Sequence, residues 1–318
     1  MAAFNDSIFY AIRKYGPYLH RQSVDERGVK SIDVSHFNYI APLLIIIFDF
    51  LVQFYNVFFI ISGKYLKKGP FFAMLLIMSI SILIRSSIVI FSYFSLAFRM
   101  NLSFNYALYI DYFSSFFSLP IIFLMSLNRY LCFVSNYYNS MIFERNNYLI
   151  FVIFSIFCIS CAATFGTIKT SGIERDFYSG VGFVDYYLEP GYKTSIARSF
   201  YIFPLGSTIC YILLFLHLKQ QSKLVMMSTR NVEQKVFAQL LITALFYGLM
   251  SIFFEAVEFL YDVIDNYQII YLISMLNIIN YLPEISLPLM LMMSTFKFSL
   301  RKVVQDVPKS TTASILNR

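Results

Sequence analysis

The sequence predicts an all-α membrane protein, a bundle of seven transmembrane helices with its N-terminus outside and its C-terminus inside the cell. Seven separate apolar stretches are each long enough to cross a hydrocarbon core, which takes about 20 helical residues for about 30 Å. Hydrophobic residues make up 58% of the 318 residues and charged residues only 14%. That is too little charge to coat a soluble protein of this size. The positive charges also gather in loops on one side.

Each predicted helix is an unbroken apolar run, unlike the alternating strands of a membrane β-barrel. The seven runs are Tyr39–Ile61, Phe71–Ser95, Ala107–Cys132, Tyr148–Thr167, Ala197–Leu218, Val236–Leu260 and Ile269–Ser294. They divide the chain into an extracellular tail (1–38), a transmembrane domain (39–294) and a cytoplasmic tail (295–318). Apolar residues at helical spacing from Phe296 to Val307 predict a short amphipathic helix on the inner leaflet.

Charge and glycosylation sequons predict the orientation of the bundle. With the N-terminus outside, the inner loops and the tail hold fourteen Lys and Arg residues, and the outer loops hold five. Loops that stay in the cytoplasm show this bias, although the N-terminal tail, with five more, opposes it. The only two N-x-[ST] sequons begin at Asn5 and Asn101, on segments predicted to lie outside. Both are therefore candidate glycosylation sites.

Composition argues against several classes of function. A net charge of +7 favours nucleic acid in a soluble protein, but cytoplasmic loops account for it here, so no nucleic-acid partner is expected. The three His residues lie in the N-terminal tail and at a helix end. No His and carboxylate metal set follows from that placement, so we expect no cofactor and no enzyme activity. The four Cys residues lie within or at the ends of helices, so no extracellular disulfide is predicted.

Charged residues within the predicted helices are candidates for function, because each costs at least about 2.5 kcal/mol in hydrocarbon unless it is paired or hydrated. Asp49 and Arg85 each lie about ten residues from the outer end of adjacent helices, roughly 15 Å deep. Matched depth predicts a structural ion pair between Asp49 and Arg85. The alternative is that Arg85 faces a ligand.

The inner end of the predicted third helix carries Asn128-Arg129-Tyr130. An Arg at this place resembles the Asp/Glu-Arg-Tyr motif of G-protein-coupled receptors, with Asn128 in place of the acid. The resemblance implies that Arg129 caps the cytoplasmic end of the resting bundle and contacts a heterotrimeric G protein when the helices part. The alternative is that Arg129 and Tyr130 are interfacial anchors.

A second segment, Asn280–Pro288 in the predicted seventh helix, runs Asn-Tyr-Leu-Pro-Glu-Ile-Ser-Leu-Pro. Together with the Leu-Asn-Arg-Tyr of the third helix, it resembles nematode serpentine chemoreceptors, and most closely the superfamily around serpentine receptor class gamma. The resemblance implies an olfactory or related sensory receptor in the plasma membrane, with a sensory cilium as one location, that binds an odorant or pheromone-like molecule. The chain departs from rhodopsin-like receptors, since it has no Asn-Pro-x-x-Tyr in the seventh helix.

Asp111, Glu255 and Asn277 are candidates for a small-molecule pocket in the outer half of the bundle. Asp111 lies 18 residues before Arg129, the separation at which amine-binding receptors place the Asp that pairs with the ligand. Glu255 lies near the outer end of the sixth helix, three residues before Glu258 and on the same face. The alternatives are hydration for the carboxylates and a hydrogen bond between helices for Asn277.

A membrane transporter or ion channel is the alternative function. It requires polar residues along a continuous path, and many transporters are built from inverted repeats with broken helices. The predicted helices carry few midplane charges, and the sequence shows no internal repeat. These features favour a receptor.

The predicted orientation leads to the first testable prediction. An epitope tag at the N-terminus should stain on intact cells, and a tag at the C-terminus should stain only after permeabilisation, because the inner loops carry the positive charge. Staining of the C-terminal tag alone on intact cells contradicts both the orientation and a receptor function.

Overall fold

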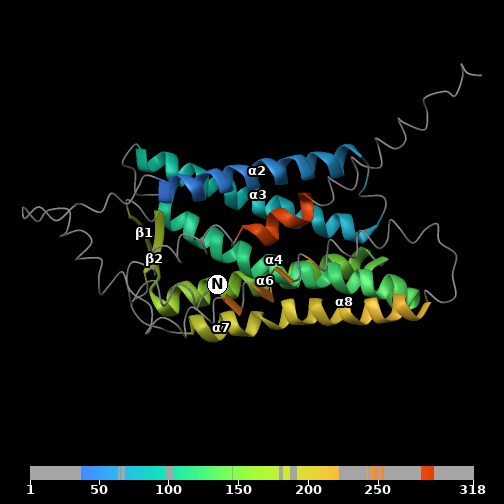
Figure 1. The fold of residues 1–318 in the computed structure, drawn as a ribbon. Helices are drawn as coiled ribbons and strands as arrows, with labels where there is room; N and C mark the ends of the chain where they lie inside the picture. The colour runs from blue at the N-terminus through green and yellow to red at the C-terminus, as the bar shows by residue number, and fades with distance from the viewer. Residues whose placement is uncertain are drawn as a thin grey trace, which may run out of the picture.

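The computed structural model describes residues 37–63, 65, 69–97, 103–144, 146–178, 182–186, 192–221 and 281–289, with isolated positions between 242 and 253. Long helices run side by side, and a small hairpin lies at one end of them (Figure 1). The elements are α2 (Phe37–Ser62), α3 (Pro70–Ala97), α4 (Ser103–Val134), α5 (Asn136–Asn139), the π-turn η2 (Ser140–Glu144), α6 (Asn146–Ser171), β1 (Glu174–Tyr178), β2 (Gly182–Tyr186), α7 (Lys193–Phe200) and α8 (Ile202–Gln221). Residues 282–289 are also helical.

Five helical stretches in this part of the chain are long and apolar enough to cross a bilayer. They are Leu43–Ser62, Pro70–Ser95, Asn105–Val134, Tyr148–Ser171 and Lys193–His217. The protein is therefore a multi-pass helical membrane protein. The first five predicted helices each overlap one of these stretches. Within the predicted sixth and seventh helices, the positions that the structure describes are helical apart from Tyr281, which lies in a turn.

α4 is the central helix of the described bundle. Half of the residues in the most apolar 18-residue segment of α4 are buried inside the structure, whereas only 11% are buried in the corresponding segment of α6. α4 packs against α3, α6 and α8, and its side chains Phe117, Ile121 and Met125 belong to the main apolar core. Because α4 contacts each of these helices, residues at its two ends are well placed to respond to changes in the bundle.

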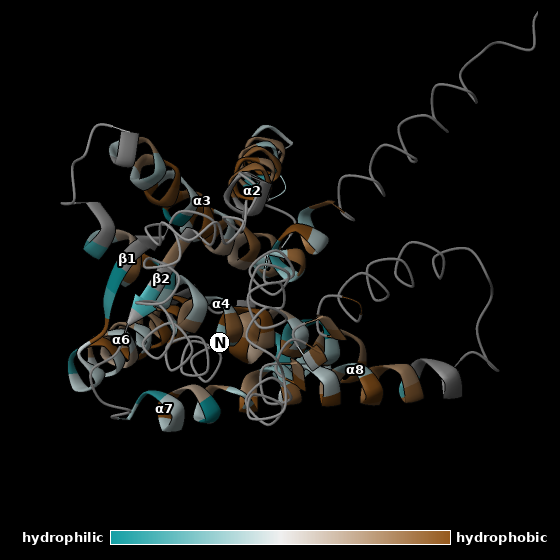
Figure 2. Cartoon of the chain, turned by 60° about the vertical axis from the view of Figure 1, so that its left-hand side comes forward, coloured by the Kyte–Doolittle hydropathy of each residue, from teal (hydrophilic) through white to brown (hydrophobic). Residues whose placement is uncertain are grey.

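The outer faces of the helices are apolar, as a lipid environment requires. Phe151 and Phe154 on α6 and Phe54 and Phe58 on α2 are all exposed. Figure 2 shows mostly hydrophobic helices, whereas β1 and β2 at the end of the bundle are mostly hydrophilic. In water such faces would be unfavourable, because monomeric soluble proteins rarely expose large apolar patches. The pattern fits helices surrounded by hydrocarbon with a polar hairpin outside it.

The described part of the chain is mostly helical, in agreement with the predicted all-α class, and the segment between the predicted fourth and fifth helices adds the short strands β1 and β2. The strands pair antiparallel, with Arg175 opposite Asp185. The Phe183 ring of β2 packs edge-on against Tyr93 of α3, with 4.6 Å between ring centroids. The hairpin therefore packs against α3 through this ring contact.

The predicted fifth helix, Ala197–Leu218, is also interrupted in the structure. α7 ends at Phe200, Tyr201 forms a turn, and α8 begins at Ile202. Pro204 explains the break, because proline has no N–H to donate to the carbonyl four residues earlier and its ring crowds that carbonyl. Proline is tolerated in the first turn of a new helix, which is where Pro204 lies. The predicted amphipathic tail helix, the C-terminal tail and residues 1–36 of the N-terminal tail lie outside the described residues, while Phe37 and Asn38 begin α2.

Gly172 connects α6 to the hairpin and sets where β1 begins. Its φ of 56° lies in the left-handed region. The Ile173 N–H donates to the Ile168 carbonyl at 3.1 Å, and both side chains are buried in one apolar cluster. This is a Schellman-type helix end, which strongly favours glycine. The turn at Gly172 and Ile173 leads directly into β1, whose second residue is Arg175.

We expect Gly172→Ala to destabilise the protein by about 1–2 kcal/mol, because an L-residue in the left-handed conformation meets its own carbonyl. Gly166→Ala, in the same helix, is the matched control. An added Cβ at Gly166 meets only Ile196 Cδ1 at 3.5 Å, so this change should be neutral or stabilising by up to about 1 kcal/mol. Thermal unfolding of the purified full chain in detergent measures both, and equal effects would contradict the helix-end geometry.

Candidate functional site

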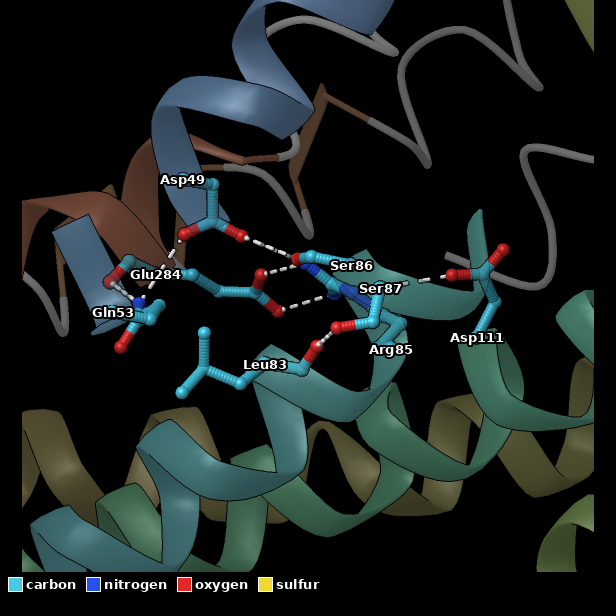
Figure 3. A network of polar contacts seen from close by, with 8 residues as sticks. All are labelled: Asp49, Gln53, Leu83, Arg85, Ser86, Ser87, Asp111 and Glu284. Atoms are coloured by element: carbon cyan, nitrogen blue, oxygen red, sulfur yellow. Dashed lines mark hydrogen bonds and ion pairs between the residues drawn. The ribbon is translucent and has the colours of Figure 1, made fainter. Parts of the chain in front are cut away.

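The most concentrated set of buried charges in the described structure surrounds Arg85 of α3, which is 4% exposed. Its Nη1 donates to Glu284 Oε1 at 2.8 Å, and its Nη2 donates to Glu284 Oε2 and to Asp49 Oδ2, the latter at 3.3 Å (Figure 3). The neighbouring Ser87 takes no part, since its hydroxyl donates to the Leu83 carbonyl of its own helix at 2.7 Å. The guanidinium thus joins α2, α3 and the helix at 282–289.

Asp49 is fully buried and is held by three side chains, two from α3 and one from its own helix α2. Besides Arg85, it accepts hydrogen bonds from Ser86 Oγ at 3.2 Å and from Gln53 Nε2 at 3.2 Å. The same Gln53 nitrogen donates to the main-chain oxygen of Glu284 at 3.0 Å. Buried polar groups normally require such partners. Gln53 therefore ties α2 to the backbone of the helix at 282–289, independently of the charged side chains.

A polar stripe continues along α2 below this network. Asp49, Gln53 and Asn56 follow at helical spacing, and each is at most 1% exposed. Asn56 Nδ2 donates to Ser79 Oγ of α3 at 2.8 Å. In hydrocarbon a polar face of this kind turns inward to neighbouring helices rather than to lipid. The stripe accounts for the close packing of α2 on α3.

The outer part of the network centres on Asp111 of α4. Its Oδ1 lies 3.9 Å from Arg85 Nε, and its Oδ2 accepts a hydrogen bond from Arg175 Nη1 of β1. Arg175 also binds Asp185 of β2 with two hydrogen bonds, Nε to Oδ1 at 2.5 Å and Nη2 to Oδ2 at 3.0 Å. A continuous chain of ion pairs therefore runs from the helix at 282–289 through α3 and α4 to the hairpin.

The network contains more negative than positive groups. Four carboxylates (Asp49, Asp111, Asp185 and Glu284) surround two guanidinium groups, a formal charge of −2. In the hairpin, burial alone disfavours the charged form of Arg175, but Asp185 and Asp111 outweigh this effect and hold the pKa of its guanidinium well above the ordinary value. Arg175 is therefore charged at every physiological pH. The site as a whole offers an environment that attracts cations.

The predicted ligand-pocket residues are only partly brought into this site. Asp111 is there, and its carboxylate lies beside two arginines, Arg85 and Arg175. Glu255 and Asn277 lie outside the described residues, and so do the sequon residues Asn5 and Asn101. The predicted pair of Asp49 and Arg85 is present, although Arg85 makes its closer contacts with Glu284.

At the opposite end of α4, the predicted coupling motif has well-defined neighbours. The guanidinium carbon of Arg129 lies 4.0 Å from the ring centroid of Phe71, at the start of α3. Asn128 is buried and its Nδ2 donates to Asn139 Oδ1 of α5 at 2.9 Å. Tyr130 is partly exposed. A cation over an aromatic face is worth about 0.5–2 kcal/mol, so this contact helps to hold Arg129 against α3.

The sequence analysis did not identify several residues that contact the predicted site residues in the structure. Glu284 had the clearest signal, because it is the only charged residue in the predicted seventh helix. Arg175 and Asp185 had none, because their pairing depends on the register of a hairpin that the pattern did not predict. Phe71 and Asn139 are ordinary in sequence, and only the fold brings them to Arg129 and Asn128.

No protein-family model matches this chain, and a search of curated proteins finds no match. Within the described residues, no group of three or more His, Cys, Asp and Glu side chains is arranged to hold a metal ion. The chemistry of the site therefore has to be argued from its own geometry.

Removing the central cation should be far more damaging than removing one of its partners. Arg85→Met leaves Asp49 and Glu284 buried without a cation, which typically costs about 3–5 kcal/mol. Asp49→Asn should cost less, because Arg85 keeps both hydrogen bonds to Glu284. Ser87→Ala is the control that changes the same helix outside the network. The fraction of full-length protein that elutes as a single folded species on size-exclusion chromatography measures each effect.

The double variant Asp49→Asn/Arg85→Met should remain as poorly folded as Arg85→Met, because Glu284 is still unpaired. Adding Glu284→Gln should recover much of the loss. Full recovery in the double variant would mean that Asp49 and Arg85 form an isolated pair.

Proposed function

We propose that the protein is a seven-transmembrane chemosensory receptor of the plasma membrane that binds a small molecule in the outer half of the bundle and activates a heterotrimeric G protein. The five membrane-spanning stretches support this proposal, because the sequence adds two more apolar segments of sufficient length, Val236–Leu260 and Ile269–Ser294. In this proposal the N-terminus is extracellular, the C-terminus is cytosolic and the hairpin faces outside.

One observation carries most of the weight. The central helix α4 holds Asp111 in the ion-pair network near one end and Asn128-Arg129-Tyr130 at the other. A ligand that changes the contacts of Asp111 alters how α3, α4 and the helix at 282–289 pack. Such a ligand favours one of two helix arrangements. The same shift changes the contact of Arg129 with Phe71, which would free Arg129 to meet the G protein.

The proposal extends to the family suggested by the sequence. We place the chain with the nematode serpentine chemoreceptors, in the superfamily around serpentine receptor class gamma, on the basis of Asn128-Arg129-Tyr130 and of Asn280–Pro288. Its ligand is then an odorant or pheromone-like molecule, and a sensory cilium is the expected location. Glycosylation at Asn5 and Asn101 fits the outward orientation of these segments.

A transporter remains the second candidate because of one observation, the buried charges around Arg85. Ionisable residues within membrane helices also form substrate and proton pathways. The two functions differ in what they require of Arg129: a receptor needs it for signalling, whereas a transporter needs it only as an anchor at the membrane surface.

We expect Arg129→Ala to reach the cell surface in near-normal amounts and to lose most of its G-protein response, because its contact with Phe71 contributes only modestly to stability. Arg145→Ala is the matched control, an arginine on the same predicted side of the membrane but outside the motif. A calcium or cyclic-nucleotide reporter measures the response to a panel of odorants, with surface staining measured in parallel. An unchanged response at normal surface level would favour the transporter.

A further inference from the structure

Asp111 is the only carboxylate of the ion-pair network that is substantially open to the outside. Its side chain is 25% exposed, whereas those of Asp49, Glu284 and Asp185 are at most 8% exposed. Asp49 and Glu284 are more deeply buried. Arg85 binds both carboxylates, and Gln53 donates hydrogen bonds to the Asp49 carboxylate and to the main-chain oxygen of Glu284. Asp111 is therefore the carboxylate of the network that a molecule from outside the described structure can reach most easily.

Arg175 binds Asp111, but its charge is also paired with a second carboxylate, that of Asp185. One nitrogen, Nη1, binds Asp111, while Nε and Nη2 form a two-pronged contact with Asp185 across the hairpin. Arg175 and Asp185 are direct partners in the register of β1 and β2. If Arg175 leaves Asp111, the charge of Arg175 remains paired within the hairpin. Among the residues that the structure describes, the cation then left beside Asp111 is Arg85, whose Nε lies 3.9 Å from Oδ1. The exchangeable contact of the network is therefore the one between Arg175 and Asp111.

The charge of the network determines which kind of molecule can replace Arg175 at Asp111. Four carboxylates against two guanidinium groups leave an excess of negative charge. Both guanidinium groups already bind carboxylates, and the excess negative charge of the network repels an anionic ligand. A cation that took the place of Arg175 at Asp111 would lower the excess of negative charge, because Arg175 would stay paired with Asp185.

We propose that Arg175 is an internal cation that occupies Asp111 in the unliganded protein, and that the ligand is an organic cation, a protonated amine or guanidine, that displaces it. The ligand head group pairs with Asp111 beneath the hairpin, and the hairpin swings off Asp111 while Arg175 stays bound to Asp185. This inference rests on the proposed function only in taking the outer half of the bundle as the ligand-binding region.

Thermal unfolding of the detergent-solubilised full chain tests this inference without any G protein. The probes are benzylammonium chloride and, at equal ionic strength, its neutral and anionic counterparts benzyl alcohol and sodium benzoate. A ligand that binds the folded protein raises its unfolding temperature with concentration. Benzylammonium should raise it, and the other two should not.

Three variants locate the effect. Arg175→Gln removes the internal competitor, so the half-maximal concentration of benzylammonium should fall about 10-fold, since a larger fraction of the protein is then ready to bind. Lys169→Gln removes an exposed positive charge of α6 at the same end of the bundle and should leave that concentration unchanged. Asp111→Asn should abolish the stabilisation.

Equal stabilisation by benzyl alcohol or benzoate, persistence of the effect in Asp111→Asn, or an identical response of Arg175→Gln and Lys169→Gln overturns the inference. Should Arg175→Gln fail to fold, the comparison of the unaltered protein with Asp111→Asn decides it. The outcome is separable from the proposed function. Loss of signalling in every assay with intact benzylammonium binding contradicts the receptor alone, and the reverse pattern contradicts only the cation site.

Discussion

The buried guanidinium of Arg85 is the interaction on which the described bundle depends. It is shared by Asp49 of α2 and by Glu284 of the helix at 282–289, two carboxylates that lie far apart in sequence. Each charge alone would be strongly unfavourable in a low-dielectric interior, so the three groups stabilise the fold only when they are together. Apolar packing against lipid cannot supply this specificity, because lipid chains are as apolar as the helix faces. Polar contacts therefore fix which helices are neighbours.

The network also links the outer hairpin with the interior of the bundle. Arg175 binds Asp111, Asp111 faces Arg85, and Arg85 holds Glu284. The stacking of Arg129 on Phe71 lies at the opposite end of α4. A change in pairing at the hairpin end alters charges that are shared by three helices, and packed helices respond by moving between discrete arrangements. This physical connection is what makes a ligand-controlled helix rearrangement a reasonable function for the site.

Much of the architecture follows from the sequence, because lipid imposes simple rules. Long apolar runs marked every membrane-spanning helix that the structure describes, and matched depth was enough to pair Asp49 with Arg85. The break at Tyr201 was missed because the apolar run is continuous through Pro204, the residue that causes it. Glu284 as the main partner of Arg85, and the match of Arg175 with Asp185, depend on which helices and strands are neighbours. Hydrophobic pattern does not contain that information.

A double-mutant cycle between Arg85 and Glu284 tests the central claim most directly. It compares the thermal unfolding of the unaltered chain with Arg85→Met, Glu284→Gln and the double variant. Residues that share a buried contact show coupling energies of about 0.5–3 kcal/mol, and residues without a shared contact are additive within about 0.5 kcal/mol. The shared guanidinium predicts a coupling of at least about 1 kcal/mol, on the scale typical of buried charge pairs. Additive effects would contradict it and would remove the helix at 282–289 from its place beside α2 and α3.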